Sequence, residues 1–326
     1  MNLSTIAQVF QIKPKTLYSW YRNVISDYHQ DKQTGNFAGH QVYDYDASTG
    51  EIRKEQVVHI FKQENFGEAM SIDEKMIGGK YSTIISNPET GKIALLIESV
   101  KPLVVAQAIA LFSQEKRQGL KYISSDMSPM YKKICREMFP NAKIIIDKFH
   151  VIKHIMDALN TVRLNIKSKL KVKKEPSTNN PNGWSDVEFL EKTKYLLYKR
   201  STLLDTEQRQ LLAKLFEQHA DLFKAYQLVE EIRAWYEPKN IGKKLYTMHY
   251  QLKKWIDKVK KSGLKSFNFI IKMFTNHWDD ILNYFINGHS NAKAENLNGR
   301  IQRFLMTNYG TRDKDFFFYR TQIYFS

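Results

Sequence analysis

Cysteine is almost absent from this chain of 326 residues, in which Cys135 is the only one. A single cysteine excludes an intrachain disulfide and any zinc site built from several cysteines. Cys135 lies in the stretch MYKKICREMF at an apolar position of a helical pattern, so we expect a buried core residue. The scarcity of cysteine is typical of an intracellular protein.

Long hydrophobic runs are missing as well. The sequence contains no run of 18 apolar residues, which excludes a helix that spans a membrane. Its first residues, MNLSTIAQVFQIKPK, lack the charged start and the apolar stretch of a signal peptide. We therefore expect a cytoplasmic protein without a membrane partner.

Acidic residues are outnumbered by basic ones. The chain has 34 acidic and 50 basic residues, which gives a net charge of +16. Such an excess indicates a polyanionic partner, and without a membrane signal nucleic acid is the better candidate. A hydrophobic content of 42% excludes a wholly disordered chain, and the length leaves room for one large domain or two to three smaller ones.

Residues 4–28 are predicted to form two short helices, with Pro14 in the first turn of the second. The apolar face of the second helix consists of Leu17, Trp20 and Val24. This pattern is typical of a helix-turn-helix, whose second helix enters a DNA groove, and the alternative is a pair of ordinary amphipathic helices. Because the chain is basic, we predict a DNA-binding segment over residues 1–30, with Lys15 and Arg22 as contacts.

A linker is predicted over residues 31–67, which are polar, with a small hairpin around DASTGE. Residues 68–163 begin with three β-rich runs, at 69–75, 80–86 and 92–99, and continue with alternating helices and strands. The resulting order, βββαβαβα, predicts an α/β fold whose later strands pair in parallel or mixed fashion through crossovers.

Residues 164–287 have a different composition. They begin with KSKLKVKKEPSTNNPNG, which is Lys-rich and then Asn/Pro-rich and indicates a loop. From residue 184 to 287 the only proline is Pro238, and apolar residues recur at helical spacing. The sequence therefore predicts an all-helical region.

Two aspartates stand at the ends of predicted strands. Asp73 lies among alternating apolar residues, and Asp126 follows the strand KYISSD. An isolated acid near a turn is usually solvated. In a βββαβαβ sheet, however, the first and fourth strands are commonly neighbours, because the crossover helix returns the chain beside the first strand. Two carboxylates that close repel each other unless a cation lies between them, and their oxygens suit Mg²⁺ or Mn²⁺.

A third acid is expected from the predicted helix HSNAKAENLNGRIQRFL at 289–305. Glu295 lies in an amide-rich stripe of this helix, beside a basic stripe of Lys293, Arg300 and Arg303. This arrangement fits a metal ligand flanked by DNA-binding groups, and the alternative is an ordinary solvated acid.

Taken together, these stretches resemble the DDE-type transposases of bacterial insertion sequences, in particular the ISL-three group. The motifs are MSIDEK at 70–75, YISSDMSPMYKK at 122–133, IIIDKFHVIKHI at 144–155 and SNAKAENLNGRIQ at 290–302. The resemblance implies an RNase H-like catalytic core with Asp73, Asp126 and Glu295 as its metal-binding triad. It also implies that residues 164–287 are a helical insertion, and that residues 288–326 carry the core's final helix.

The stretch DKFH at 147–150 resembles the D-x-x-H signature that accompanies the second aspartate in such enzymes. It implies that Asp147 and His150 lie near the active site. Many relatives carry a cysteine-rich zinc module that recognises DNA ends, and one cysteine cannot build it. The helices at 1–30, or a separate protein, would then supply that role.

The function implied by the resemblance is DNA transposition. Such an enzyme hydrolyses a phosphodiester at the ends of an insertion sequence and joins the freed 3′-OH to target DNA, using two Mg²⁺ or Mn²⁺ ions. We expect double-stranded DNA as partner, at least a homodimer, and association with the bacterial nucleoid. Two alternatives stay open: an RNase H-like structure-specific nuclease without strand transfer, and a non-enzymatic helix-turn-helix regulator.

Overall fold

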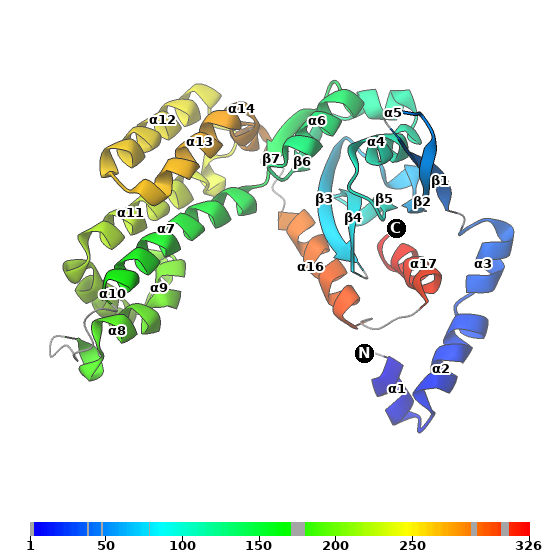
Figure 1. The fold of residues 1–326 in the computed structure, drawn as a ribbon, viewed down its shortest axis with the longest axis horizontal. Coiled ribbons are helices and arrows are strands. Elements are labelled where there is room, and N and C mark those ends of the chain that lie inside the picture. The colour runs from blue at the N-terminus through cyan, green and yellow to red at the C-terminus, as the bar shows by residue number, and fades with distance from the viewer. Residues whose placement is uncertain are drawn as a thin grey trace. The chain divides into compact units, whose positions relative to one another are not determined.

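The computed structural model describes residues 3–37, 39–46, 48–77, 79–170, 180–287, 292–307 and 313–326, without the side chains of residues 182, 287, 292–295, 298, 305 and 307. The chain divides into two compact units (Figure 1). The first, here called the sheet unit, comprises Met1–Ile145 and Ser290–Ser326, and the second, the helical unit, comprises Ile146–His289. Each unit is described by itself.

Seven strands of the described chain form one mixed sheet, in the order β1-β2-β5-β4-β3-β6-β7. They are β1 (His40–Tyr45), β2 (Ile52–Phe61), β3 (Ala69–Ile77), β4 (Lys80–Asn87), β5 (Lys92–Ile97), β6 (Tyr122–Ser125) and β7 (Lys143–Ile146). The neighbouring pairs β1–β2, β2–β5, β5–β4 and β4–β3 are antiparallel, and β3 pairs with β6 in parallel. The predicted α/β class is confirmed, as is the prediction that the strand of Asp73 neighbours the strand before Asp126.

The helices of the sheet unit are α1 (Leu3–Val9), α2 (Pro14–Trp20), α3 (Tyr28–Thr34), α4 (Pro102–Ala110), α5 (Gln114–Gly119), α6 (Pro129–Met138), α16 (Ala292–Thr307) and α17 (Lys314–Phe325). The two faces of the sheet bury different sets of side chains. Met70 and Ile72 of β3 pack in a core with α4 and α6. Ile77 of the same strand packs in a second core with α16 and α17. Because side chains alternate along a strand, Asp73 shares the face of Ile77.

Residues 31–67, predicted as a linker with a small hairpin, hold β1 and β2, and both strands belong to the sheet. Val42, Val58 and Ile60 of these strands are buried in the two cores. The segment looked like a linker because the first half of β2 is polar and exposed, so that only its last residues show a strand's apolar alternation.

The N-terminal helices differ from the predicted apolar face. Trp20 is 49% and Val24 74% exposed, whereas Tyr28 is buried against Phe316 and Tyr319 of α17. A π-helix at Tyr21–Ile25 follows α2. Its wider turn ends the 3.6-residue period from which the face was predicted, so residues after Trp20 point elsewhere.

The helical unit contains α7 (Lys148–Leu170), α8 (Asp186–Lys192), α9 (Lys194–Tyr198), α10 (Thr206–Gln218), α11 (Ala220–Trp235), α12 (Leu245–Ser262), α13 (Asn268–Asn276), α14 (Trp278–Leu282) and α15 (Tyr284–Asn287). Its described residues beyond Ile146 form no strand, and α7, predicted with the catalytic core, belongs here. Trp255 of α12 donates from its indole N–H to the Leu228 carbonyl of α11 at 2.9 Å, so the ring is fixed in the core. Among the described residues, every helix is too short or too polar to cross a bilayer.

Candidate active site

The parallel register of β3 and β6 brings two carboxylates to neighbouring positions. Ser71 of β3 pairs with Ser124 of β6. Asp73 and Asp126 each follow two residues later, and neighbouring strands lie about 4.8 Å apart. Two residues is one full period of the pleat, so Asp73 keeps the face of Ser71 and Asp126, just past the end of β6, continues from Ser124. The register therefore brings the two acids to the same end of the parallel pair.

Each aspartate is held by local contacts. The Lys75 Nζ lies 3.2 Å from Asp73 Oδ2, and the backbone N–H of Glu74 donates to Asp73 Oδ1 at 2.8 Å. Asp126 Oδ1 accepts from the backbone N–H of Ser128 at 2.9 Å, at the start of α6. Asp73 is 19% exposed and Asp126 is half-buried, so solvent and ligands can reach both. These contacts fix the carboxylates and leave oxygen atoms able to accept further bonds.

Glu74 lies next to Asp73 in sequence but on the opposite face of β3, because strand side chains alternate. Burial raises the pKa of Glu74, and the negative charges of Asp126 and Asp73 raise it further. On that face the Tyr131 hydroxyl lies 3.0 Å from Thr83 Oγ1, and burial raises the pKa of Tyr131. Sequence reasoning missed Glu74 and Lys75 as members of this charged group, although strand alternation around Asp73 could have placed both.

Helix α16 covers the face of the sheet on which Asp73 lies. Figure 1 shows α16 beside β3 and β4. Its Leu297 and Ile301 are each 1% exposed and pack in one core with Ile77 of β3 and Ile84 of β4. Glu295 stands two residues before Leu297 in this helix, but its side chain lies outside the described part of the structure. The helix that carries the predicted third acid is thus docked on the correct face, and the convergence of three acids stays a prediction.

Of the predicted basic stripe on α16, Arg300 and Arg303 are described and exposed, while the side chain of Lys293 is not described. The Arg300 guanidinium lies 5.5 Å from the centre of the Phe325 ring. Such a cation–π contact leaves the donor groups of the guanidinium available. Arg300 and Arg303 therefore stay predicted DNA contacts.

The described residues fit a divalent cation in their chemistry. Carboxylate oxygens are the ligands that Mg²⁺ and Mn²⁺ prefer. Ser124 Oγ is buried on the face of the sheet that carries Asp73 and has no hydrogen-bond partner in the described structure. Among the described side chains, no three of His, Cys, Asp or Glu lie close enough together to hold a metal ion. The side chain of Glu295 is not among those described.

Asp147 and His150 begin the helical unit and contact each other. The distance from His150 Nε2 to Asp147 Oδ2 is 3.9 Å. Asp147 Oδ1 accepts from the Phe149 backbone N–H at 2.8 Å, as a residue that caps the start of α7. This contact gives the D-x-x-H stretch a structural role, and its proximity to the acids of the sheet unit stays a prediction.

The two predicted DNA contacts of the N-terminal helices have different surroundings. Lys15 is exposed. Arg22 donates to Asp313 Oδ2 at 2.5 Å, and its guanidinium lies 5.0 Å from the centre of the Tyr28 ring. Arg22 therefore ties the N-terminal helices to the residue that caps α17, whereas Lys15 is open to a ligand.

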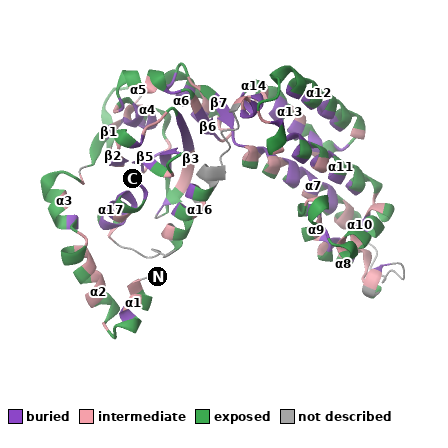
Figure 2. Ribbon diagram, turned by 180° about the vertical axis from the view of Figure 1, so that it is seen from behind, coloured by how far each residue is buried: buried purple, intermediate pink, exposed green. Residues whose placement is uncertain are grey.

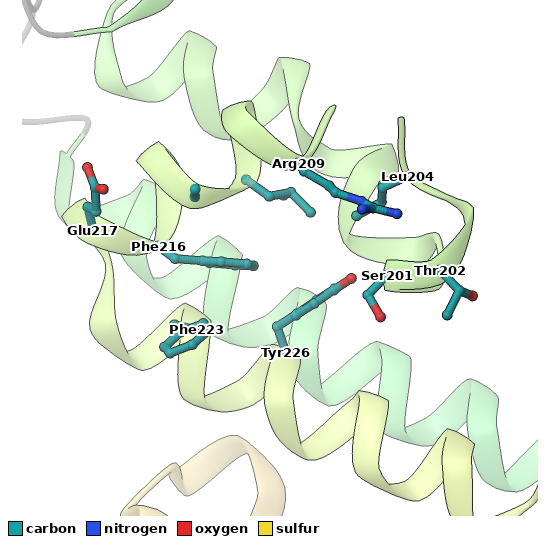
Figure 3. A pocket seen from close by; sticks show the side chains of 10 residues that line it. Ser201, Thr202, Leu204, Arg209, Phe216, Glu217, Phe223 and Tyr226 are labelled. Carbon is teal, nitrogen blue, oxygen red and sulfur yellow. The ribbon is translucent and has the colours of Figure 1, made fainter. Parts of the chain in front are cut away.

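A separate cavity of about 770 Å³ lies in the helical unit, between α10, α11 and the turn Ser201–Leu203. Figure 3 shows Phe216 and Tyr226 along one side of it and Arg209 across from Tyr226. The Phe216 and Tyr226 rings are 5.1 Å apart between centres. The residues predicted for the active site do not line this cavity.

Two observations agree with the family found by comparing the chain with known proteins. They are the position of Asp73 and Asp126 at the parallel strand pair of the mixed sheet, and the four sequence motifs. Residues 70–321 match a family described as transposase, the DDE type of the ISL-three group. The chain belongs to this family. The resemblance drawn from the motifs is therefore confirmed, and the match extends across the helical unit.

The chain is also 23% identical over 265 residues to the transposase for insertion sequence element IS1001 of Bordetella parapertussis. The match covers 79% of this chain and 61% of that relative, so the chain spans about three fifths of the relative's length. No solved structure matches the chain.

Proposed function

We propose that this member of the DDE transposase family cleaves DNA at the ends of an insertion sequence and transfers the freed strand to a target. The observation that carries the proposal is the parallel pairing of β3 with β6, in which Ser71 and Ser124 are partners two residues before Asp73 and Asp126, with α16 packed on the face of β3 that carries Asp73. Glu295 completes the set from α16, within an RNase H-like core. The IS1001 relative, named as a transposase, supports the same activity.

Asp73, Asp126 and Glu295 would hold two Mg²⁺ or Mn²⁺ ions, in keeping with the general use of divalent metals by DDE transposases. When bound, the ions supply activation of the attacking oxygen and stabilise the entering and leaving oxygens of an in-line displacement. The chain itself orients the acids through strand register. Arg300 and Arg303 bind DNA phosphates, and Lys75, whose Nζ lies 3.2 Å from Asp73 Oδ2, offsets the charge of Asp73.

The proposed partner is double-stranded DNA, both at the element's ends and at the target. Since two ends must be brought together, we propose at least a homodimer. In this proposal the N-terminal helices read DNA as a helix-turn-helix, and the helical unit is an insertion between the second and third acids. The protein would then act at the bacterial nucleoid.

The test is cleavage of end-containing DNA by Asp73→Asn in Mg²⁺. Asn keeps the shape of the side chain but removes the charge that binds a cation, and it relieves repulsion with Asp126. We expect a folded, DNA-binding protein whose cleavage rate falls by several orders of magnitude, since activation of the nucleophile is the main chemical contribution. Asp157→Asn, an exposed acid on α7, is the matched control and should cleave like the parent.

A strand-transfer assay with pre-cut ends separates the proposal from its alternatives. Cleavage without joining would indicate a structure-specific nuclease. DNA binding without either reaction in the parent would indicate a regulator. Parent-like cleavage by Asp73→Asn would remove Asp73 from the metal site.

A further inference from the structure

Helix α12 has one face built into the core of the helical unit. Its buried residues are Met248, Leu252, Trp255, Ile256 and Val259. The indole of Trp235 on α11 also donates to the Met248 carbonyl at 3.2 Å. The helix is therefore fixed in rotation about its own axis, and its opposite face is fixed in solvent (Figure 2).

The opposite face of α12 is basic and aromatic. Tyr246 is 79% exposed and Tyr250 48% exposed, and Lys253, Lys260 and Lys261 continue the same stripe at helical spacing. From residue 243 to 265 the chain has eight lysines and one acid, Asp257. Five of these lysines lie within α12 itself: Lys253, Lys254, Lys258, Lys260 and Lys261.

Most of these lysines are not neutralised within the molecule. Lys258 pairs with Glu231 at 2.8 Å, and Lys260 lies 3.9 Å from Asp257. The others have no carboxylate within 4 Å in the described part of the chain; they are Lys243, Lys244, Lys253, Lys254, Lys261 and Lys265. Lys254 instead lies 4.5 Å from the centre of the Tyr250 ring. Like charges held together on a rigid helix repel each other, so an external anion would stabilise them.

We propose that this outward face of α12, together with the flanking Lys243, Lys244 and Lys265, binds the phosphate backbone of DNA. The proposal deepens the proposed function and rests on it. From Tyr246 to Lys261 the helix is about 22 Å long at 1.5 Å per residue, and duplex DNA carries about one charge per 1.7 Å. Several lysines can therefore meet phosphates at once, and the tyrosine hydroxyls can donate to phosphate oxygens.

An anionic membrane is the less favoured partner of this face. Helices that lie in a membrane interface bury their apolar face in the lipid. The apolar face of α12 is already buried in the helical unit, so only charge attraction would remain. Phosphates in DNA are spaced regularly along a rigid surface, which suits lysines fixed on a straight helix.

The experiment measures binding of the full chain to a generic DNA duplex over a series of salt concentrations. The variant carries Lys253→Gln, Lys254→Gln and Lys261→Gln together. The matched control carries Lys192→Gln, Lys214→Gln and Lys224→Gln, which remove the same charge from exposed positions of α8, α10 and α11. Thermal unfolding of all three proteins checks that each is folded.

We expect the α12 variant to bind DNA about tenfold or more weakly near 0.1 M salt, and its slope of log affinity against log salt to decrease by about 2 to 3. The control should stay within about threefold of the parent. Equal loss in both variants, or no loss in the α12 variant while the parent binds, would overturn the proposal and leave the transposase function standing. A parent that binds no DNA would overturn the proposed function and this proposal together.

Binding to anionic lipid vesicles is measured in parallel. Parent-like DNA affinity combined with lost vesicle binding in the α12 variant would assign the face to a membrane and overturn the proposal. Lost DNA binding in that variant, with the control unchanged, supports it.

Discussion

The sheet unit and the helical unit use charge in different ways. The sheet unit, with 182 residues, has 24 basic and 18 acidic residues, and the shorter helical unit has 26 basic and 16 acidic residues. The helical unit therefore carries a net charge of +10 against +6. The acids of the proposed metal site belong to the sheet unit, and the lysines of the proposed DNA-binding face lie along one helix of the helical unit.

This difference follows from the geometry of the two kinds of element. Parallel pairing fixes Ser71 against Ser124, two residues before Asp73 and Asp126, through backbone hydrogen bonds, and a metal site requires such accuracy. A helix face such as that of α12 spaces its charges over a longer distance. That arrangement tolerates small displacements, because phosphate contacts position a duplex without reading single atoms. We infer that the sheet unit performs the chemistry and that the helical unit contributes to DNA affinity.

The largest effect should come from the third acid. Glu295→Gln should lower the cleavage rate by several orders of magnitude, like Asp73→Asn, because both groups are proposed to hold the same ions. The double variant should be little worse than either single variant, since residues that act as a unit are not additive. Single-turnover cleavage in Mg²⁺ measures all three. Independent, multiplying losses would show that Glu295 acts outside the site of Asp73.

A large effect on stability is expected where α16 docks on the sheet. Ile301→Ala should lower the free energy of unfolding by about 2–4 kcal/mol, because Ile301 is 1% exposed and its truncation leaves a cavity. Urea unfolding, followed separately for each unit, measures the change. Met306→Ala on the same helix is the control, since Met306 is 64% exposed and its loss should cost less than about 0.5 kcal/mol. Equal effects would mean that α16 is not packed as described.

The sequence predicted the sheet unit's central features for physical reasons. Alternation over residues 69–75 and the βββαβαβα order were enough to predict that the strand of Asp73 neighbours the strand before Asp126, because crossover connections allow few arrangements. β1 and β2 were missed because most of β2 is exposed and polar. The exposure of Val24 was missed because a π-helix interrupts the helical period.

The surface of α12 illustrates a different limit. Its lysines are visible in the sequence, but their importance depends on how many acids lie nearby in space. Lys258 meets Glu231 from another helix, whereas Lys253 has no such partner among the described residues. Composition gives the total charge of a segment and cannot give its neutralisation by distant segments.

A moderate effect is expected inside the helical unit, at a pair that is structural rather than functional. Arg163 is 2% exposed and donates to Glu191 at 3.0 Å, and Lys167 also contacts this carboxylate. Hydrogen bonds from Lys167 and Arg163 lower the pKa of Glu191 to about 2. Glu191→Gln should reduce stability at pH 7 by about 1–2 kcal/mol, a modest value because Glu191 is 40% exposed and water screens the pair.

The pH dependence gives this prediction its control. A carboxylate with a lowered pKa in the folded state stabilises the protein above its unfolded pKa of about 4.3. That stabilisation is lost as the pH falls toward 2. The difference between parent and Glu191→Gln in urea unfolding should therefore be constant from pH 7 to 5 and shrink below about pH 4. A difference that persists unchanged to low pH would show that packing, and not charge, explains the loss.

The smallest effects are expected from two substitutions in the N-terminal helices, at Lys15 and at Arg22. Lys15→Ala should weaken DNA binding by a fewfold and reduce the salt slope by about 1, because an exposed lysine contributes about one phosphate contact. Arg22→Ala should instead reduce stability, since it removes the ion pair with Asp313 that ties these helices to α17. Salt-dependent binding and urea unfolding, applied to both variants, distinguish the roles. If Lys15→Ala binds DNA with the parent's slope while the α12 variant does not, DNA affinity lies in the helical unit and the N-terminal helices serve the fold.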